Sequence, residues 1–127
     1  MRGFPGKIRQ MGWAQKADST ESPMFAVATR ELLALWQLSP ESGWQNWMLD
    51  IHNDNVLDVA FQPNTDLLAS ASAEGWVILW KGATEVAQIL DGAKTGFSCI
   101  AWHPTGEHLA AGGQQGEVMI WTTYREA

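Results

Sequence analysis

Short apolar runs that end in tryptophan recur along the chain at intervals of about 40 residues. The runs cover 33–36, 77–80 and 118–121, and their last residues, Trp36, Trp80 and Trp121, are 44 and 41 residues apart. Spacing of this size is typical of repeat proteins, in which each repeat folds into one small unit that packs on the next. Because the runs are short and rich in β-branched and aromatic residues, they predict β-strands.

The second and third repeats are related by internal duplication. Shifting Leu57–Trp80 by 41 positions onto Ser98–Trp121 gives seven identities in 24 positions. Pro63 then matches Pro104, and Gly75 matches Gly116. Proline and glycine favour turns, because proline cannot donate a ladder hydrogen bond and glycine accepts positive φ. The duplication therefore predicts antiparallel sheets joined by tight turns at matching positions.

Each repeat is predicted to form one antiparallel sheet. The predicted strands are Lys7–Ala14, Met24–Thr29, Glu31–Leu38 and Gln45–Ile51 in the first repeat; Val56–Phe61, Asp66–Ser72, Gly75–Lys81 and Thr84–Leu90 in the second; and Phe97–Trp102, Glu107–Gly113 and Gly116–Thr122 in the third. We expect the third sheet to lack an outer strand and the polar segment Gln15–Pro23 to be an exposed, inserted loop. Many positions on both sides of these strands are apolar or small, which indicates that the sheets stack face to face.

Several of these segments resemble the WD-repeat β-propeller family. The resemblance is carried by His52 placed nine positions before Phe61, by the run Val59–Ser70, by the closing run Val77–Trp80, and in the third repeat by Ile100–Gly106 and Ile120–Trp121. It extends over nearly the whole chain. The resemblance implies an all-β fold, a partial propeller of three blades with antiparallel four-stranded sheets and a last blade lacking its outer strand. We treat 1–127 as a single partial propeller with blades at about 3–52, 53–92 and 93–127.

Strong repeats of this family contain a buried hydrogen-bonded set of His, Ser, Asp and Trp. The Asp usual in the turn before the closing Trp is replaced in the three repeats by Arg30, Glu74 and Gln115. The resemblance therefore implies that the set is incomplete in every blade, with His52, Ser70 or Ser72, and Trp80 keeping part of it. We expect modest stability as a result, because each such bond contributes only about 1 kcal/mol but several act together.

Composition narrows the possible partners. The net charge of -6 and the pI of about 4.8 disfavour nucleic acid and anionic membranes, both of which need clustered Lys and Arg. No apolar run approaches the roughly 20 residues that cross a bilayer. The single cysteine, Cys99, permits no internal disulfide, so we expect a reducing, cytoplasmic location. Because Cys99 lies in a strand-like run, we expect it to be a small buried hydrophobe.

Signatures of catalysis and of cofactor binding are missing from the sequence. It has no Gly-x-Ser-x-Gly elbow, no phosphate-binding Walker loop, no Cys-x-x-Cys pair and no His-Glu-x-x-His helix. His103 and His108 flank a turn, and a metal site would also need a distant third ligand. We predict no catalytic residues, no cofactor, no metal and no enzymatic activity.

These observations predict a non-catalytic scaffold for protein–protein interactions. Three blades cannot close a ring, so we expect either a fragment or C-terminal part of a larger propeller, or completion by association with another protein or a second copy. The candidate partner-contact residues are Trp44, Trp47 and Trp76, each of which could instead fill a gap between blades. The alternative is a segment that closes the propeller of an enzyme whose catalytic groups lie elsewhere. Turnover on adding a complementary fragment would favour that alternative.

Overall fold

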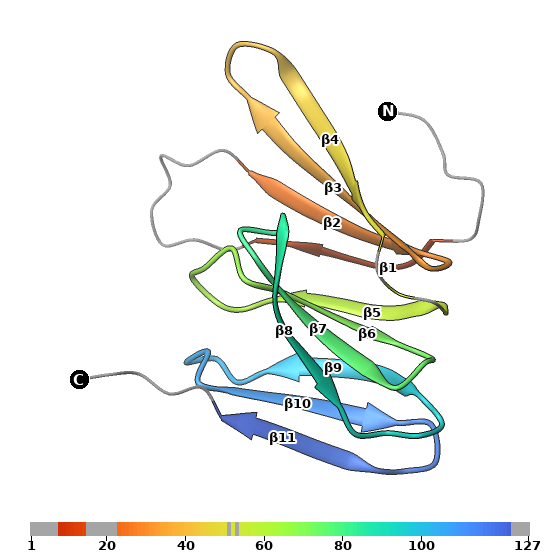
Figure 1. Ribbon diagram of the computed structural model, residues 1–127. Helices are drawn as coiled ribbons and strands as arrows, with labels where there is room; N and C mark the ends of the chain where they lie inside the picture. The colour runs from red at the N-terminus through yellow and green to blue at the C-terminus, as the bar shows by residue number, and fades with distance from the viewer. Residues whose placement is uncertain (1–7, 15–22, 51, 53, 123–127) are drawn as a thin grey trace.

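The computed structural model describes residues 8–14, 23–50, 52 and 54–122 (Figure 1). Over these ranges the chain forms eleven strands in three antiparallel sheets, with no helix. The all-β prediction and the division into three sheets are therefore confirmed. Within the same ranges, nothing forms a helix of the length and apolarity that crossing a membrane requires.

The first sheet has four strands in the order β1-β2-β3-β4. Its strands are β1 (Ile8–Trp13), β2 (Met24–Thr29), β3 (Leu32–Ser39) and β4 (Gly43–Leu49). The outer strand β4 begins two residues earlier than predicted, because Gly43, with a φ of +74°, allows the chain to reverse directly after Ser39. Residues 15–22, which form most of the predicted inserted loop, lie outside the described residues, as do Lys7 and Ile51.

The second sheet repeats this order and contains the best-buried strand of the protein. Its strands are β5 (Val56–Phe61), β6 (Leu68–Ser72), β7 (Trp76–Lys81) and β8 (Glu85–Asp91). All five residues of β6 are buried, because neighbouring sheets cover both of its faces. Strand β6 begins two residues later than predicted, since the Thr65 hydroxyl accepts the backbone N–H of Leu67 and extends the turn after β5.

The third sheet has three strands in the order β11-β10-β9 within the described residues, which end at Thr122. Its strands are β9 (Phe97–Trp102), β10 (His108–Gly113) and β11 (Val118–Thr122). The predicted absence of an outer strand therefore agrees with the described part of this sheet. Strand β11 forms its free edge.

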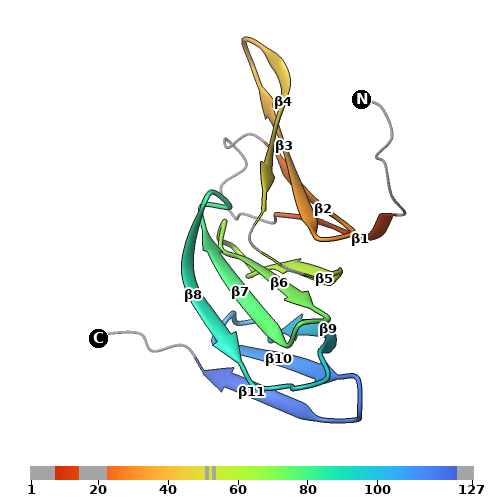
Figure 2. The ribbon, with the colours of Figure 1, turned by 45° about the vertical axis from the view of Figure 1, so that its right-hand side comes forward.

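The sheets stack on one another (Figures 1 and 2), and the apolar core lies between them. One apolar cluster joins the first and second sheets and includes Leu35, Phe61 and Trp80. A second cluster joins the second and third sheets and includes Leu79 and Phe97. The inner strands β1, β5 and β9 lie next to one another across these two contacts. Because each cluster needs two sheets, the dry interior exists only where one sheet covers another.

Candidate functional site

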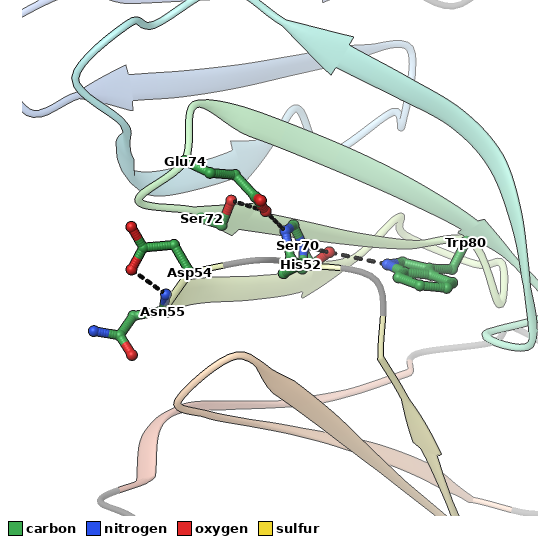
Figure 3. A network of polar contacts seen from close by, with 7 residues as sticks. All are labelled: His52, Asp54, Asn55, Ser70, Ser72, Glu74 and Trp80. Atoms are coloured by element: carbon green, nitrogen blue, oxygen red, sulfur yellow. Dashed lines mark hydrogen bonds and ion pairs between the residues drawn. The ribbon is translucent and has the colours of Figure 1, made fainter.

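A series of hydrogen bonds runs through the second sheet from Trp80 to Glu74 (Figure 3). Trp80 donates its Nε1–H to Ser70 Oγ at 2.9 Å. Ser70 Oγ lies 2.7 Å from His52 Nε2, and His52 Nδ1 contacts Glu74 Oε1. Ser72 donates its hydroxyl to the same Glu74 oxygen at 2.7 Å. The network ties the segment before β5 to β6, to β7 and to the turn between them.

The donor and acceptor chemistry of these groups assigns the proton on His52. An indole N–H can only donate, so Ser70 Oγ accepts from Trp80 and directs its own hydrogen to His52 Nε2. Neutral His52 then carries its hydrogen on Nδ1 and donates it to the Glu74 carboxylate. His52 is only 4% exposed, and this burial lowers its pKa below 6.5, although the hydrogen bond and charge of Glu74 act in the opposite direction. The ring is thereby held as a neutral structural link.

The prediction that the buried polar set is incomplete in every blade is wrong for the second sheet. Glu74 occupies the place of the usual Asp, and its carboxylate reaches both His52 and Ser72. Of the two serines considered, Ser70 is the one that bridges His52 and Trp80. Within the described residues, no buried polar side-chain atom of this set lacks a hydrogen-bond partner. These hydrogen bonds therefore help to hold this sheet together.

Each sheet has two faces, which we name by the closing tryptophans. The front face carries Trp36, Trp80 or Trp121, and the back face is the opposite one. In both internal contacts the front face of one sheet packs on the back face of the sheet before it. This arrangement leaves two faces without a neighbour among the described residues: the front of the first sheet and the back of the third.

The uncovered front face of the first sheet is aromatic and apolar. Trp13, Phe25 and Trp36 are paired across β1, β2 and β3 and form one row. Trp13 is 53% exposed even though its ring centroid lies 4.7 Å from that of Phe25. Met11 and Met48, on the adjacent row, are exposed as well. The small residues between them, Val27 and Ala34, are buried, so the exposed apolar surface of this face is carried by its tryptophan and methionine side chains.

The uncovered back face of the third sheet is apolar and built from small residues near its centre. Val118 is 74% exposed and Ile120 is 67% exposed, both on the edge strand β11. Ala101 and Ala110 are paired next to Ile120 and line a shallow depression with a volume of about 580 Å³. Cys99 lies on the same face and is exposed, so the expectation of a buried cysteine is wrong. The physical reason is that no sheet covers this face in the described residues.

The three candidate contact tryptophans occupy different environments. Trp44 is 37% exposed and belongs to the open front face of the first sheet, where its ring centroid lies 6.3 Å from that of Trp13. Trp47 packs against the core between the first and second sheets and donates its Nε1–H to the carbonyl oxygen of Ala83 at 2.8 Å. Trp76 is half-buried against the same core. The structure does not bring the three together into one patch.

Residues that the sequence analysis did not single out dominate the open faces. They are Met11, Trp13 and Met48 in the first sheet, and Val118 and Ile120 in the third. The signal that could have found them is the duplication itself. When the first or third sheet is aligned with the second by the repeat, each open face corresponds to a face that is covered in the second sheet.

The histidines of the third sheet make structural contacts. No group of three His, Cys, Asp or Glu side chains with the geometry for a metal ion occurs in the ranges that the structure describes. The His103 and His108 rings pack edge to face with their centroids 5.6 Å apart. Each also contacts a threonine hydroxyl, Thr105 at 2.9 Å and Thr122 at 3.0 Å respectively. These contacts are those of a turn and a strand end.

Comparison with known proteins identifies relatives that are much longer than this chain. Protein HIR1 of Cryptococcus neoformans is 27% identical over 97% of the chain, which covers 15% of that protein. Protein transport protein SEC13 homolog A of Arabidopsis thaliana is 33% identical over 78% of the chain, which covers 37% of that protein. A probable cytosolic iron-sulfur protein assembly protein 1 of Candida glabrata is 33% identical over 58% of the chain and is covered to 23%. The chain thus spans well under half the length of each.

The family model described as "WD domain, G-beta repeat" matches residues 43–81 and 84–122. Each match begins with the outer strand of one sheet, β4 or β8, and continues through three strands of the next. A repeat of the sequence is therefore offset by one strand from a sheet of the structure, so each repeat links two neighbouring sheets covalently. The two matches cover more than half of the chain, which belongs to the WD40 repeat family.

Proposed function

We propose that this chain is a non-catalytic interaction module whose open sheet faces dock other proteins. The observation that carries the proposal is the pair of uncharged apolar faces at the two ends of the stack. Trp13 on the first sheet and Ile120 on the third are both more than half exposed. Apolar patches of this kind on a folded protein mark contact sites, because leaving them in water costs free energy that a partner recovers.

Membership of the WD40 repeat family supports a protein-interaction scaffold role. The names of the relatives refer to protein transport and to cytosolic iron-sulfur protein assembly, which are different processes. What these proteins share with this chain is the repeat, so the proposal rests on the repeat and its surfaces and not on either process.

The finer proposal is that the three sheets are part of a larger propeller. Each internal sheet contact buries a front face on a back face, and the two end faces are composed to make that contact again. Further repeats of a longer protein, or a second copy, would meet this need. We also propose a reducing, cytoplasmic location, which the single cysteine supports because it has no partner for a disulfide within the sequence.

Affinity capture from a cell extract, with quantitative identification of the retained proteins, tests this function. Trp44→Ser removes an aromatic group from the open front face, and Val86→Ser is its control on β8. The two residues are 37% and 36% exposed, so neither change removes a buried side chain. We expect Trp44→Ser to lower the yield of a retained protein several-fold and Val86→Ser to leave it unchanged. Equal retention by the wild-type chain and Trp44→Ser, or no specific retention at all, would contradict the proposal.

A further inference from the structure

The contact between the second and third sheets includes a specific polar bond between the inner strands β5 and β9. Trp102, on the front face of the third sheet, donates its Nε1–H to the carbonyl oxygen of Ala60 on β5 at 3.1 Å. Around this bond, Ile100 and Leu109 of the front face pack in one cluster with Leu79 of the opposing back face. An aromatic front face therefore seats on a back face of small and aliphatic residues.

The strand pairings give each of these residues an equivalent on the open faces. Trp102 pairs with Leu109, and Leu109 pairs with Trp121. In the first sheet, Trp13 pairs with Phe25, and Phe25 pairs with Trp36. Trp13 therefore stands in the first sheet where Trp102 stands in the third.

The open back face of the third sheet matches the covered back face of the second in the same way. The register that pairs Ala60 with Ala69 and Ala69 with Leu79 in the second sheet pairs Ala101 with Ala110 and Ala110 with Ile120 in the third. These residues are three alternating positions across the sheet in each case. The carbonyl oxygen of Ala101 is thus the equivalent of the Ala60 oxygen that accepts from Trp102.

We propose that a second copy of this chain covers both open faces, with the front of each first sheet seated on the back of the other copy's third sheet. In this arrangement Trp13 of one copy donates its Nε1–H to the Ala101 carbonyl oxygen of the other, as Trp102 does to Ala60. The paired positions of the two open faces carry no Lys, Arg, Asp or Glu, so the contact buries no unpaired charge.

Reciprocal contact closes the assembly. Each copy has one open front and one open back among the described residues. Two copies related by a two-fold axis through the centre of the ring, perpendicular to the direction in which the sheets stack, therefore satisfy all four faces in a ring of six sheets. The inference rests on the proposed function and specifies its partner. It uses both halves of an interface that the chain already contains.

Sedimentation velocity of the purified full chain at micromolar concentration tests the inference. We expect a species of twice the 14.0 kDa chain mass. Ile120→Glu places a charge on the open back face at a residue that is already exposed, so the sheet stays folded while the dimer dissociates. Ile89→Glu, at an exposed residue of the middle sheet, is the matched control and is expected to remain dimeric. Circular dichroism of both variants checks that the strands are retained.

The polar bond is tested separately by Trp13→Phe, which keeps an aromatic ring against Phe25 and removes the N–H. We expect the dissociation constant of the dimer to rise about 25-fold, because the symmetric dimer contains this bond twice and the loss of each neutral hydrogen bond corresponds to about fivefold. An unchanged dissociation constant would overturn the seating of Trp13 on Ala101.

A monomer at micromolar concentration, or open chains larger than a dimer, would overturn the closed two-copy ring. The outcome for the proposed function is read independently. A monomer that still retains another protein through Trp44 leaves the interaction module standing and excludes the second copy as its partner. A monomer that retains none removes both.

Discussion

The carboxylate of Asp58 on β5 accepts the backbone N–H of Ile100 on β9, with Oδ2 and N 2.8 Å apart. Its Oδ1 accepts the backbone N–H of Val59 at 2.9 Å. The Gln10 side chain on β1 also forms a hydrogen bond to the Asp58 carboxylate. One buried acid thus contacts the inner strands of all three sheets. Burial raises the pKa of Asp58 above its ordinary value, and these hydrogen bonds limit the rise.

Removing this acid is expected to loosen the stack. Asp58→Ala leaves the buried N–H of Ile100 without its acceptor, so we expect the free energy of unfolding to fall by about 1–3 kcal/mol. Urea denaturation followed by tryptophan fluorescence measures the change. The control is Asp91→Ala, at an exposed residue of β8. A loss for Asp58→Ala no larger than that of the control would show that the bond between β5 and β9 adds no stability.

Acid is expected to destabilise the second sheet through His52. The folded-state pKa of His52 lies below 6.5, so its contribution to stability is fully present above pH 6.5 and is lost as the pH falls through the lower, folded-state value. Each unit of difference corresponds to about 1.4 kcal/mol. The measurement is urea denaturation between pH 7.5 and pH 5 for the wild-type chain and for His52→Gln, whose side chain does not titrate. If both proteins have the same pH dependence, His52 is not the responsible group.

Two equivalent glycines offer a test of sheet stacking. Gly75 and Gly116 both have positive φ, +95° and +89°, in matching turns. A Cβ on Gly75 would overlap the carbonyl oxygen of Ala93, whereas a Cβ on Gly116 meets nothing within 4 Å. Both alanine variants carry the backbone strain, of order 1 kcal/mol, but only Gly75→Ala adds the overlap. We expect it to be clearly the less stable of the two in thermal unfolding. Equal melting temperatures would mean that the turn at Gly75 shifts to accommodate the added Cβ without a loss of stability.

The two tryptophans of β4 are expected to differ in their effect on stability. Trp47→Phe removes the bond to the Ala83 carbonyl and part of the packing between the first two sheets, so we expect a loss of about 1–2 kcal/mol. Trp44→Phe changes an exposed ring and should stay within about 0.5 kcal/mol of the wild type. Chemical denaturation measures both. A larger effect at Trp44 than at Trp47 would reverse the assignment of packing and surface roles.

The period of the closing tryptophans and the turn residues between them predicted the three sheets, and most strand limits lie within one residue of the predicted ones. Pro63 and Pro104 stand in the turns after β5 and β9, as predicted, because proline cannot join a ladder. Strand ends such as Asp66 were less predictable, since a side-chain bond from Thr65 decides where the turn stops.

The polar network and the open faces show where sequence reasoning reached its limit. The replacement of the usual Asp by Glu in the turn before β7 leads to the prediction that the His lacks its acidic partner. The longer side chain of Glu74 nevertheless brings its carboxylate into contact with His52. Cys99 reads as a core residue because its run is strand-like, and its exposure depends on whether a further sheet covers that face. The first error concerns the reach of one side chain, and the second concerns tertiary neighbours that local pattern does not encode.

The exposed position of Cys99 gives the protein a built-in attachment point for a reporter dye. It is the one cysteine of the chain, so a maleimide fluorophore would label a single defined place on the back of the third sheet, without any mutation. Quenching or a shift in the emission wavelength of the attached dye would then report in real time when another molecule binds to that face. Slower labelling of Cys99 would report the same binding before the dye is attached.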